Sequence, residues 1–212
     1  MARFNQMLEE IISDLSRIFK VHLNPMMKKP LVIVGLGNPG EKYKQTRHNV
    51  GFMAAELFAS KNKIEFNLKK KTAIIGEGLS NDKDLVIAKP RTFVNYSGQA
   101  IKYLTDRYHI PVSSFLIVFD DMDLPLGQIR MKSSGGSGGH NGLNSILHTL
   151  QADNFSRLRI GIGRPKGNTI DHVLSRFETT EIPTLEKALD DAYKATCSWV
   201  NHGIDYAMNK FN

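Results

Sequence analysis

The chain has 212 residues, 41% of them hydrophobic, which suits one domain, or a domain with a small appendage, around a single core. Its one cysteine, Cys197, excludes an internal disulfide framework and fits a reducing compartment, from which we expect a cytoplasmic protein. No apolar run approaches the roughly 20 residues of a membrane span, and the net charge of +7 is compatible with a polyanionic partner without requiring one.

The first 27 residues have a pattern of their own. Apolar side chains recur at helical spacing between Met7 and Phe19, with charged residues on the other side, which predicts an amphipathic helix. Its acidic residues and interrupted apolar face are untypical of targeting peptides. We therefore expect an N-terminal amphipathic extension, residues 1–27, and an α/β domain, residues 28–212, although residues 26–30 would equally suit the natural start of a compact domain.

The segment from Leu31 to Gly51 organises the rest of the chain. Its apolar, β-branched start, residues 31–34, is typical of a strand buried on both faces, and the glycines and proline that follow break that strand sharply. Asn38 and His48 would then lie at the carboxyl edge of a core strand, which is where open α/β sheets place their ligands.

The glycine spacing in this segment also matches a dinucleotide-binding fingerprint. That fingerprint requires a helix that starts within the turn and an acidic residue roughly 20 positions later. Neither is present, because residues 41–45 show no helical apolar period and residues 59–61 end a helix instead. We therefore interpret the glycines as a turn that presents Asn38, and we expect no nucleotide cofactor.

The middle of the chain predicts alternating helices and strands. A helix is expected over residues 49–60, and strands are expected over 64–68, 72–79 and 85–88. The triple lysine between the first two strands is interpreted as a solvated turn, with a nucleic-acid contact as the alternative. Asn95 repeats the placement of Asn38, because it too follows a core strand and precedes a helix.

The most apolar strand, residues 115–119, runs directly into Asp120, Asp121 and Asp123. Three acids at the end of a buried strand could bind a divalent metal, but the sequence supplies no convincing further ligands. We favour the alternative, in which one aspartate orients a histidine and the others cap or solvate the turn. This interpretation contains no metal.

Basic residues gather in the later part of the chain. A strand at 128–132 carries Arg130 and Lys132 on one face, a glycine-rich loop follows at 133–142, and a strand at 157–165 adds three arginines. The loop can be a plain linker. Its backbone N–H groups, between two cations and the start of the next helix, also make it a candidate phosphate-binding loop.

Two helices, at residues 183–202 and 204–210, close the chain. Cys197, on the first of them, is interpreted as a packed thiol. The histidines away from the motifs are interpreted as structural or exposed, and they are His22, His109, His148, His172 and His202.

Five residues form a candidate catalytic set, namely His48, Asp120 and three asparagines. An imidazole can take a proton from water at neutral pH, and an aspartate on its other nitrogen would fix the tautomer. The amides of Asn38, Asn95 and Asn141 can donate to a developing oxyanion without changing charge. Because no serine or cysteine lies in a nucleophile elbow and no metal-ligand set is evident, the set predicts water-mediated hydrolysis of an activated ester.

Five motif regions, in order and with compatible spacing, make the chain resemble the bacterial peptidyl-tRNA hydrolase family from about Lys29 to the C-terminus. They are IVGLGNPG with TRHNVG, TFVNYSG, DDMDLPLG, GGSGGHNGL and RLRIGIGRP. The resemblance implies a single α/β domain with a central mixed, twisted β-sheet flanked by α-helices, acting as a monomer without a cofactor. It implies metal-independent hydrolysis of the ester between a peptide, or an N-blocked aminoacyl group, and the 3′ ribose of tRNA, so that stalled or dropped-off peptidyl-tRNA is recycled during translation.

The resemblance also implies roles for individual residues. His48 matches the general base and Asp120 the carboxylate that orients it. Asn38 and Asn95 match asparagines that hold the peptide and position the base, and Asn141 matches the one associated with the water and the oxyanion. Lys132 and Arg159 match cations that bind the 5′ phosphate of the tRNA. The full set of implied substrate and tRNA contacts is Tyr43, Thr46, Phe93, Asn95, His140, Asn141, Arg130, Lys132 and Arg159.

Three positions depart from the family's usual residues. Phe119 stands where His or Tyr is common, Val94 where Met is common, and Ser137 where another polar or a basic residue is frequent. None belongs to the hydrolytic set, so we expect altered binding rather than lost activity. The alternative is a non-catalytic RNA-binding relative, which would keep the cations but cleave no ester, and the intact His/Asp/Asn set argues against it.

Overall fold

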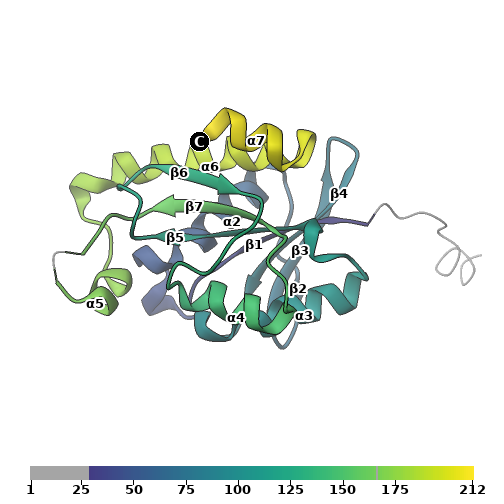
Figure 1. Ribbon diagram of the computed structural model, residues 1–212, viewed down its shortest axis with the longest axis horizontal. Coiled ribbons are helices and arrows are strands. Elements are labelled where there is room, and N and C mark those ends of the chain that lie inside the picture. The colour runs from purple at the N-terminus through teal and green to yellow at the C-terminus, as the bar shows by residue number, and fades with distance from the viewer. Residues whose placement is uncertain (1–28, 166) are drawn as a thin grey trace, which may run out of the picture.

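The computed structural model describes residues 29–165 and 167–212 and shows one seven-stranded β-sheet with helices on both faces (Figure 1). The amphipathic helix expected in residues 1–27 lies outside the described residues, so the division of the chain at residue 28 stays a prediction. Among the described helices, none combines the length and apolar content that crossing a membrane requires.

The strands follow the order β2-β3-β4-β1-β5-β7-β6. Their bounds are β1 Leu31–Gly35, β2 Leu68–Lys69, β3 Ala73–Ser80, β4 Lys83–Pro90, β5 Phe115–Asp121, β6 Ile129–Lys132 and β7 Ser156–Gly161. The helices are α2 Val50–Lys61, α3 Ser97–Tyr108, α4 Asn141–Leu150, α5 Thr169–Leu174, α6 Ile182–His202 and α7 Ile204–Phe211. Short 3₁₀ turns join several of these elements, among them η2 Arg47–Asn49 and η3 Val94–Tyr96.

The sheet is mixed, and its centre is parallel. β1 pairs in parallel with β4 and β5, and β5 pairs in parallel with β7. β2, β3 and β6 add antiparallel pairs at the two sides. Because parallel strands end at the same edge, the segments after β1, β4 and β5 meet there. This carboxyl edge lies at the left of Figure 1, at the end of the molecule that carries α5.

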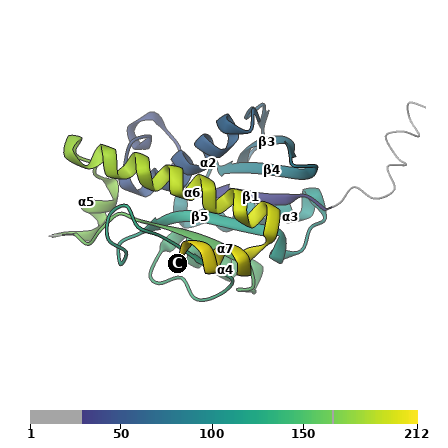
Figure 2. The same ribbon diagram turned by 90° about the horizontal axis from the view of Figure 1, so that it is seen from above.

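Two apolar cores cover the two faces of the sheet. One packs α2, α6 and α7 against the sheet and includes Phe58, Leu116 and Trp199. The other packs α3 and α4 against the opposite face and includes Phe115 and Phe155. Figure 2, viewed from above, shows α6 and α7 lying across the first face. The helix α2, which follows His48 in the chain, is therefore held in place by packing in the first of these cores.

Two glycines let the start of α2 approach the sheet closely. A Cβ on Gly51 would collide with the carbonyl oxygen of Val118 on β5, and one on Gly35 would collide with the backbone of Gly51. Any side chain at these positions would push α2 away from the strands. The contact fixes the segment just before α2 directly above the carboxyl edge of the sheet.

The predicted fold class, a single α/β domain with a mixed sheet, is confirmed, and two local predictions are wrong. The strand expected at 64–68 reduces to Leu68, because the N–H of Ile64 bonds to the carbonyl of Ala59 (2.9 Å) and ties the segment to the end of α2. The strand expected at 157–165 is β7, which begins at Ser156 and already ends at Gly161. The helix α5 was not expected from the sequence at all.

Candidate active site

The polar residues singled out at the ends of separate strands come together at the carboxyl edge. A cavity of about 260 Å³ is lined by Asn38, His48, Asn95 and Asn141, and an adjoining one of about 120 Å³ is lined by His48, Asp120 and Asn141. The two cavities share His48 and Asn141, so they form one cleft around the imidazole. The structure thus brings all five predicted catalytic residues to one place.

His48 is held by a turn that is anchored far along the chain. The N–H of its neighbour Arg47 donates to the carbonyl of Ser175 (2.9 Å). Arg47 is buried, and its guanidinium pairs with Glu181 (2.5 Å). The same guanidinium lies over the ring of Phe177, 4.8 Å from its centroid. A buried charge of this kind requires its partner, so the turn η2 is fixed against the start of α6. Sequence reasoning did not identify this support.

His48 and His140 both contact one oxygen of Asp120. Nδ1 of His48 lies 2.7 Å from Oδ1 of Asp120, and Nε2 of His140 lies 3.1 Å from the same oxygen. Nδ1 of His140 accepts the N–H of Leu143 (3.1 Å), so the proton of that ring is on Nε2, which donates to Asp120. With His48 also donating through Nδ1, its Nε2 keeps a free lone pair.

The environment keeps Asp120 ionised. Burial alone would raise the pKa of this carboxyl, which is 3% exposed, but His140 and His48 beside it lower the pKa well below its usual range. Asp120 is therefore a carboxylate at neutral pH, and it can accept both N–H groups. An anion fixed against Nδ1 also favours any positive charge that forms on the His48 ring.

The three acids at and just beyond the end of β5 have separate partners, and this bears on the possibility of a metal site. Asp121 pairs with Arg159 and Asp123 pairs with Arg164, whereas Asp120 faces the histidines. The ligand atoms of His48, Asp120 and His140 lie within 4.8 Å of one another and could geometrically hold a cation. The hydrogen bonds among these three groups account for that proximity. A site without a metal stays a prediction.

Asn38 is oriented by two neighbours. Its backbone N–H donates to Oδ1 of Asn49 (2.8 Å), and Nδ2 of Asn49 donates back to the carbonyl of Asn38 (3.0 Å). The side-chain Oδ1 of Asn38 accepts the N–H of Val94 (2.9 Å). Because its oxygen is occupied in this way, the amide of Asn38 offers its NH₂ group to the cleft. Asn49, adjacent to His48 in the chain, is a supporting residue that sequence reasoning missed.

The other predicted contacts occupy the rim of the cleft. Asn95 and Asn141 are exposed, as is Phe93, whose ring meets that of Tyr43 edge-on at 6.3 Å. Thr46 differs, because it is 2% exposed and its hydroxyl donates to the carbonyl of Tyr43 (2.8 Å). Thr46 therefore shapes the turn that carries Tyr43 rather than presenting its own side chain.

The short helix α5 supplies an apolar wall that was not anticipated. Ile170 and Val173 line both parts of the cleft, and Leu174 lines the larger part. Ile170 is 65% exposed, so its side chain is accessible from the cleft. Two features of the sequence point to this helix: the spacing of the three apolar residues, and Asn168, whose side chain caps the helix. A helix of about one and a half turns is too short for such features to be recognised in a sequence.

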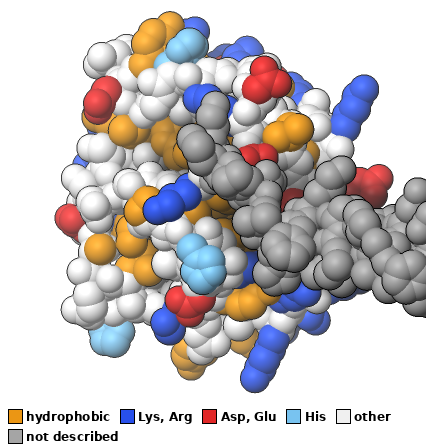
Figure 3. Space-filling model, turned by 90° about the vertical axis from the view of Figure 1, so that its right-hand side faces the viewer, with side chains coloured by type: hydrophobic (Ala, Val, Ile, Leu, Met, Phe, Trp, Pro, Cys, Tyr) orange, Lys and Arg blue, Asp and Glu red, His pale blue; other side chains and the backbone are white. Residues whose placement is uncertain are grey.

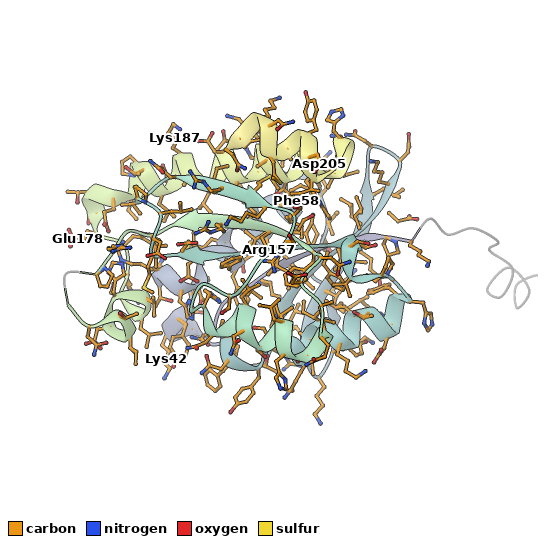
Figure 4. All side chains as sticks on the ribbon, in the orientation of Figure 1. Lys42, Phe58, Arg157, Glu178, Lys187 and Asp205 are labelled. Atoms are coloured by element: carbon orange, nitrogen blue, oxygen red, sulfur yellow. The ribbon has the colours of Figure 1, made fainter. Side chains whose placement is uncertain are left out.

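The predicted phosphate-binding loop lies beside the smaller part of the cleft. A cavity of about 250 Å³ is lined by Lys132, Arg159 and the glycine-rich loop. Arg159 pairs with Asp121, and Arg130 is exposed on β6 in register with Arg159. The buried Arg157, which Figure 4 shows inside the molecule, donates to the carbonyl of Gly135 (2.5 Å) and anchors the loop. Neither Asp121 nor Arg157 was assigned these roles from the sequence.

The three departures from the family pattern have structural contacts. Phe119 is 3% exposed, and its ring meets that of His140 edge-on at 4.9 Å. Val94, 4% exposed, provides the N–H that orients Asn38. The carbonyl of Ser137 accepts the N–H of His140 (3.0 Å). All three support the site through packing or backbone groups.

Comparison with known proteins identifies the family of the chain. The family model for peptidyl-tRNA hydrolase matches residues 32–212. Curated peptidyl-tRNA hydrolases from Syntrophomonas wolfei and Synechocystis are 45% and 44% identical over 181 and 186 residues, covering 85% and 86% of this chain and 99% and 96% of theirs. The crystal structure of peptidyl-tRNA hydrolase from Acinetobacter baumannii superposes with a TM-score of 0.82 at 38% identity, covering 89% of this chain and 97% of that one. The chain belongs to the peptidyl-tRNA hydrolase family.

Proposed function

We propose that this protein hydrolyses the ester between a peptide, or an N-blocked aminoacyl group, and the 3′ ribose of tRNA, releasing both for reuse in the cytoplasm. The observation that carries the assignment of roles is the pair of hydrogen bonds from His48 and His140 to Oδ1 of Asp120. It leaves Nε2 of His48 as a base within the cleft. We expect the protein to act as a monomer.

In the proposed reaction, Nε2 of His48 takes a proton from water as the water oxygen attacks the ester carbonyl. Asp120 stabilises the imidazolium that forms. The amide of Asn141 donates to the carbonyl oxygen as it becomes negative, and Asn38 and Asn95 hold the peptide. The tetrahedral intermediate then collapses: the imidazolium returns its proton to the 3′ oxygen of the ribose, which leaves as a hydroxyl. No metal or cofactor takes part.

The tRNA would be recognised on the side of the glycine-rich loop. Lys132, Arg159 and the backbone N–H groups of the loop would bind the 5′ phosphate, and Arg130 would contact the nearby RNA backbone. Tyr43 and Phe93 would meet the 3′ end, with Thr46 supporting the turn that carries Tyr43. Figure 3 shows the side of the molecule opposite α5, where basic side chains are interspersed with acidic ones. The net positive charge of the chain therefore does not by itself locate the tRNA-binding surface.

The proposed activity predicts a preference for a blocked amino group. Purified protein should cleave an N-acetyl-aminoacyl-tRNA much faster than the same tRNA with a free α-amino group, because the asparagines would pair with a peptide amide and would leave a free ammonium unpaired. Release of free tRNA, measured by its electrophoretic mobility, tests this. Equal rates would contradict the peptide-holding role, and tRNA binding without any cleavage would favour a non-catalytic RNA-binding protein.

The phosphate-binding loop predicts a separable effect on affinity. Lys132→Ala should raise KM by about tenfold, leave kcat nearly unchanged and reduce the dependence of binding on salt by about one phosphate contact. Lys187→Ala, an exposed lysine on α6, is the matched control. The difference between wild type and Lys132→Ala should vanish on a tRNA that lacks its 5′ phosphate. Its persistence there would show that Lys132 contacts another part of the tRNA.

A further inference from the structure

A second groove opens from the cleft between the two helices on the α3/α4 face. It has a volume of about 510 Å³, and the residues that line it are Asn95, Tyr96, Gln99, Asn141, Asn144, Ser145, His148 and Thr149. Asn95 and Asn141 also line the catalytic cleft. The groove is therefore continuous with the place where the ester carbonyl would lie.

The groove is polar but carries no charged side chain. Among its lining residues there is no Lys, Arg, Asp or Glu, although 23% of the whole chain is charged. The helix α4, residues 141–150, contains none of these residues along its entire length. An exposed helix face on a soluble domain ordinarily carries charged residues. Here the amides of Asn141 and Asn144, the hydroxyls of Ser145 and Thr149 and the imidazole of His148 replace them, and these five positions form one helical stripe.

The two helices meet closely at the floor of the groove. A Cβ on Gly98 would collide with the side chain of Thr149, and the N–H of Gly98 donates to the hydroxyl of Ser145 (3.1 Å). The hydroxyl of Thr149 is also occupied, because it donates to the carbonyl of Ser145 (2.8 Å). The floor is thus internally satisfied and rigid.

The amides above this floor are unoccupied. The side chains of Gln99 and Asn144 are exposed and make no hydrogen bond to any other residue that the structure describes, and the same holds for Asn95 and Asn141. Each amide offers both a donor and an acceptor. A row of such groups matches the alternating N–H and C=O groups of an extended peptide, whatever its side chains are.

We propose that this groove binds the main chain of the peptide residues that precede the ester-linked residue. The inference rests on the proposed function and adds the course of the peptide. The stripe from Asn141 to Thr149 spans about 12 Å along the helix, and an extended chain advances about 3.3 Å per residue. The groove therefore accommodates about three to four residues.

Charge separates this groove from the surfaces that suit RNA. A nucleic-acid backbone requires cations. Lys132 and Arg159 line the cavity beside the glycine-rich loop, and Lys44, Lys89 and Arg91 line a different cavity. A peptide of arbitrary sequence instead requires neutral groups that recognise its backbone. The uncharged groove fits the peptide, and the basic loop fits the tRNA.

The test uses one tRNA esterified to N-acetylated alanine peptides of one to six residues. In the wild type, kcat/KM should rise with peptide length and level off after about three to four added residues. The double variant Gln99→Ala, Asn144→Ala should lose about tenfold on the longest substrates. It should cleave the one-residue substrate at the wild-type rate, because neither residue belongs to the catalytic set.

Asn154→Ala, which removes an exposed amide beyond the C-terminal end of α4, is the matched control and should leave the length dependence unchanged. A wild type that cleaves every length equally well would overturn the inference while leaving the proposed function intact. An equal loss on short and long substrates in the double variant would also overturn it, because the groove would then hold the tRNA end. A wild type that cleaves none of the substrates would instead refute the proposed function itself.

Discussion

Replacing His48 with alanine is expected to lower kcat for N-acetyl-aminoacyl-tRNA by about 10²- to 10⁴-fold. The variant loses Nε2 of His48, which lies within the cleft. The other nitrogen of His48 and both nitrogens of His140 already make hydrogen bonds. Water must then attack without transfer of its proton to a base. Single-turnover measurements with saturating enzyme would isolate this chemical step from substrate binding.

The accompanying controls separate chemistry from folding and from binding. His202→Ala removes an exposed histidine at the end of α6 and should leave kcat unchanged. His48→Ala should bind deacylated tRNA nearly as well as the wild type, because the proposed phosphate contacts lie beside the glycine-rich loop. A fully folded His48→Ala protein that retains more than about a tenth of the wild-type kcat would contradict the assignment of the base.

The position of the site was predictable because local sequence patterns determine it. The apolar run 31–34 ends at glycines, and the apolar run 115–119 ends at acids, so each pattern reports where a buried strand stops. Parallel pairing of β1 with β5 then places Asn38, His48 and Asp120 at one edge. No knowledge of side-chain contacts was needed for this step, which depends only on the periodicity and on the order of the strands.

The partners within the site were not predictable, because they depend on contacts between distant residues. Asp121 meets Arg159 across 38 positions, and Arg47 meets Glu181 across 134. The tautomer of His140 depends on the N–H of Leu143, which is free to donate only because it lies in the first turn of α4. Such pairings follow from the fold, and the sequence shows only that suitable residues exist.

Asp120 and Asp121, neighbours at the end of β5, have different proposed roles. Successive side chains on a strand point to opposite faces, so Asp120 and Asp121 are directed apart. Asp120 meets the two histidines, whereas Asp121 holds Arg159 near the glycine-rich loop. The same short segment therefore positions the proposed base and one of the cations proposed to bind tRNA.

Replacing Asp120 with asparagine is expected to lower kcat by about 10²- to 10⁴-fold with little change in tRNA affinity. The amide has nearly the same shape as the carboxylate and can still meet Nδ1 of His48. It carries no negative charge, so it stabilises the imidazolium poorly, and its NH₂ group favours the wrong tautomer. Comparison of kcat with the affinity for deacylated tRNA, measured on the same preparation, tests the separation. A proportional loss of both would indicate a collapsed cleft instead.

The same variant has a second expected signature in the stability of the fold. Because the histidines lower the pKa of the Asp120 carboxyl in the folded state, its ionisation stabilises the native protein above the unfolded-state pKa of about 4. That stabilisation is lost as the pH falls through the lower, folded-state value. Asparagine does not titrate, so the difference in unfolding free energy between wild type and Asp120→Asn should shrink below about pH 4. A difference that stayed constant from pH 7 into this acid range would mean that Asp120 is not held ionised by its two imidazoles, and the orientation of the base would then need another explanation.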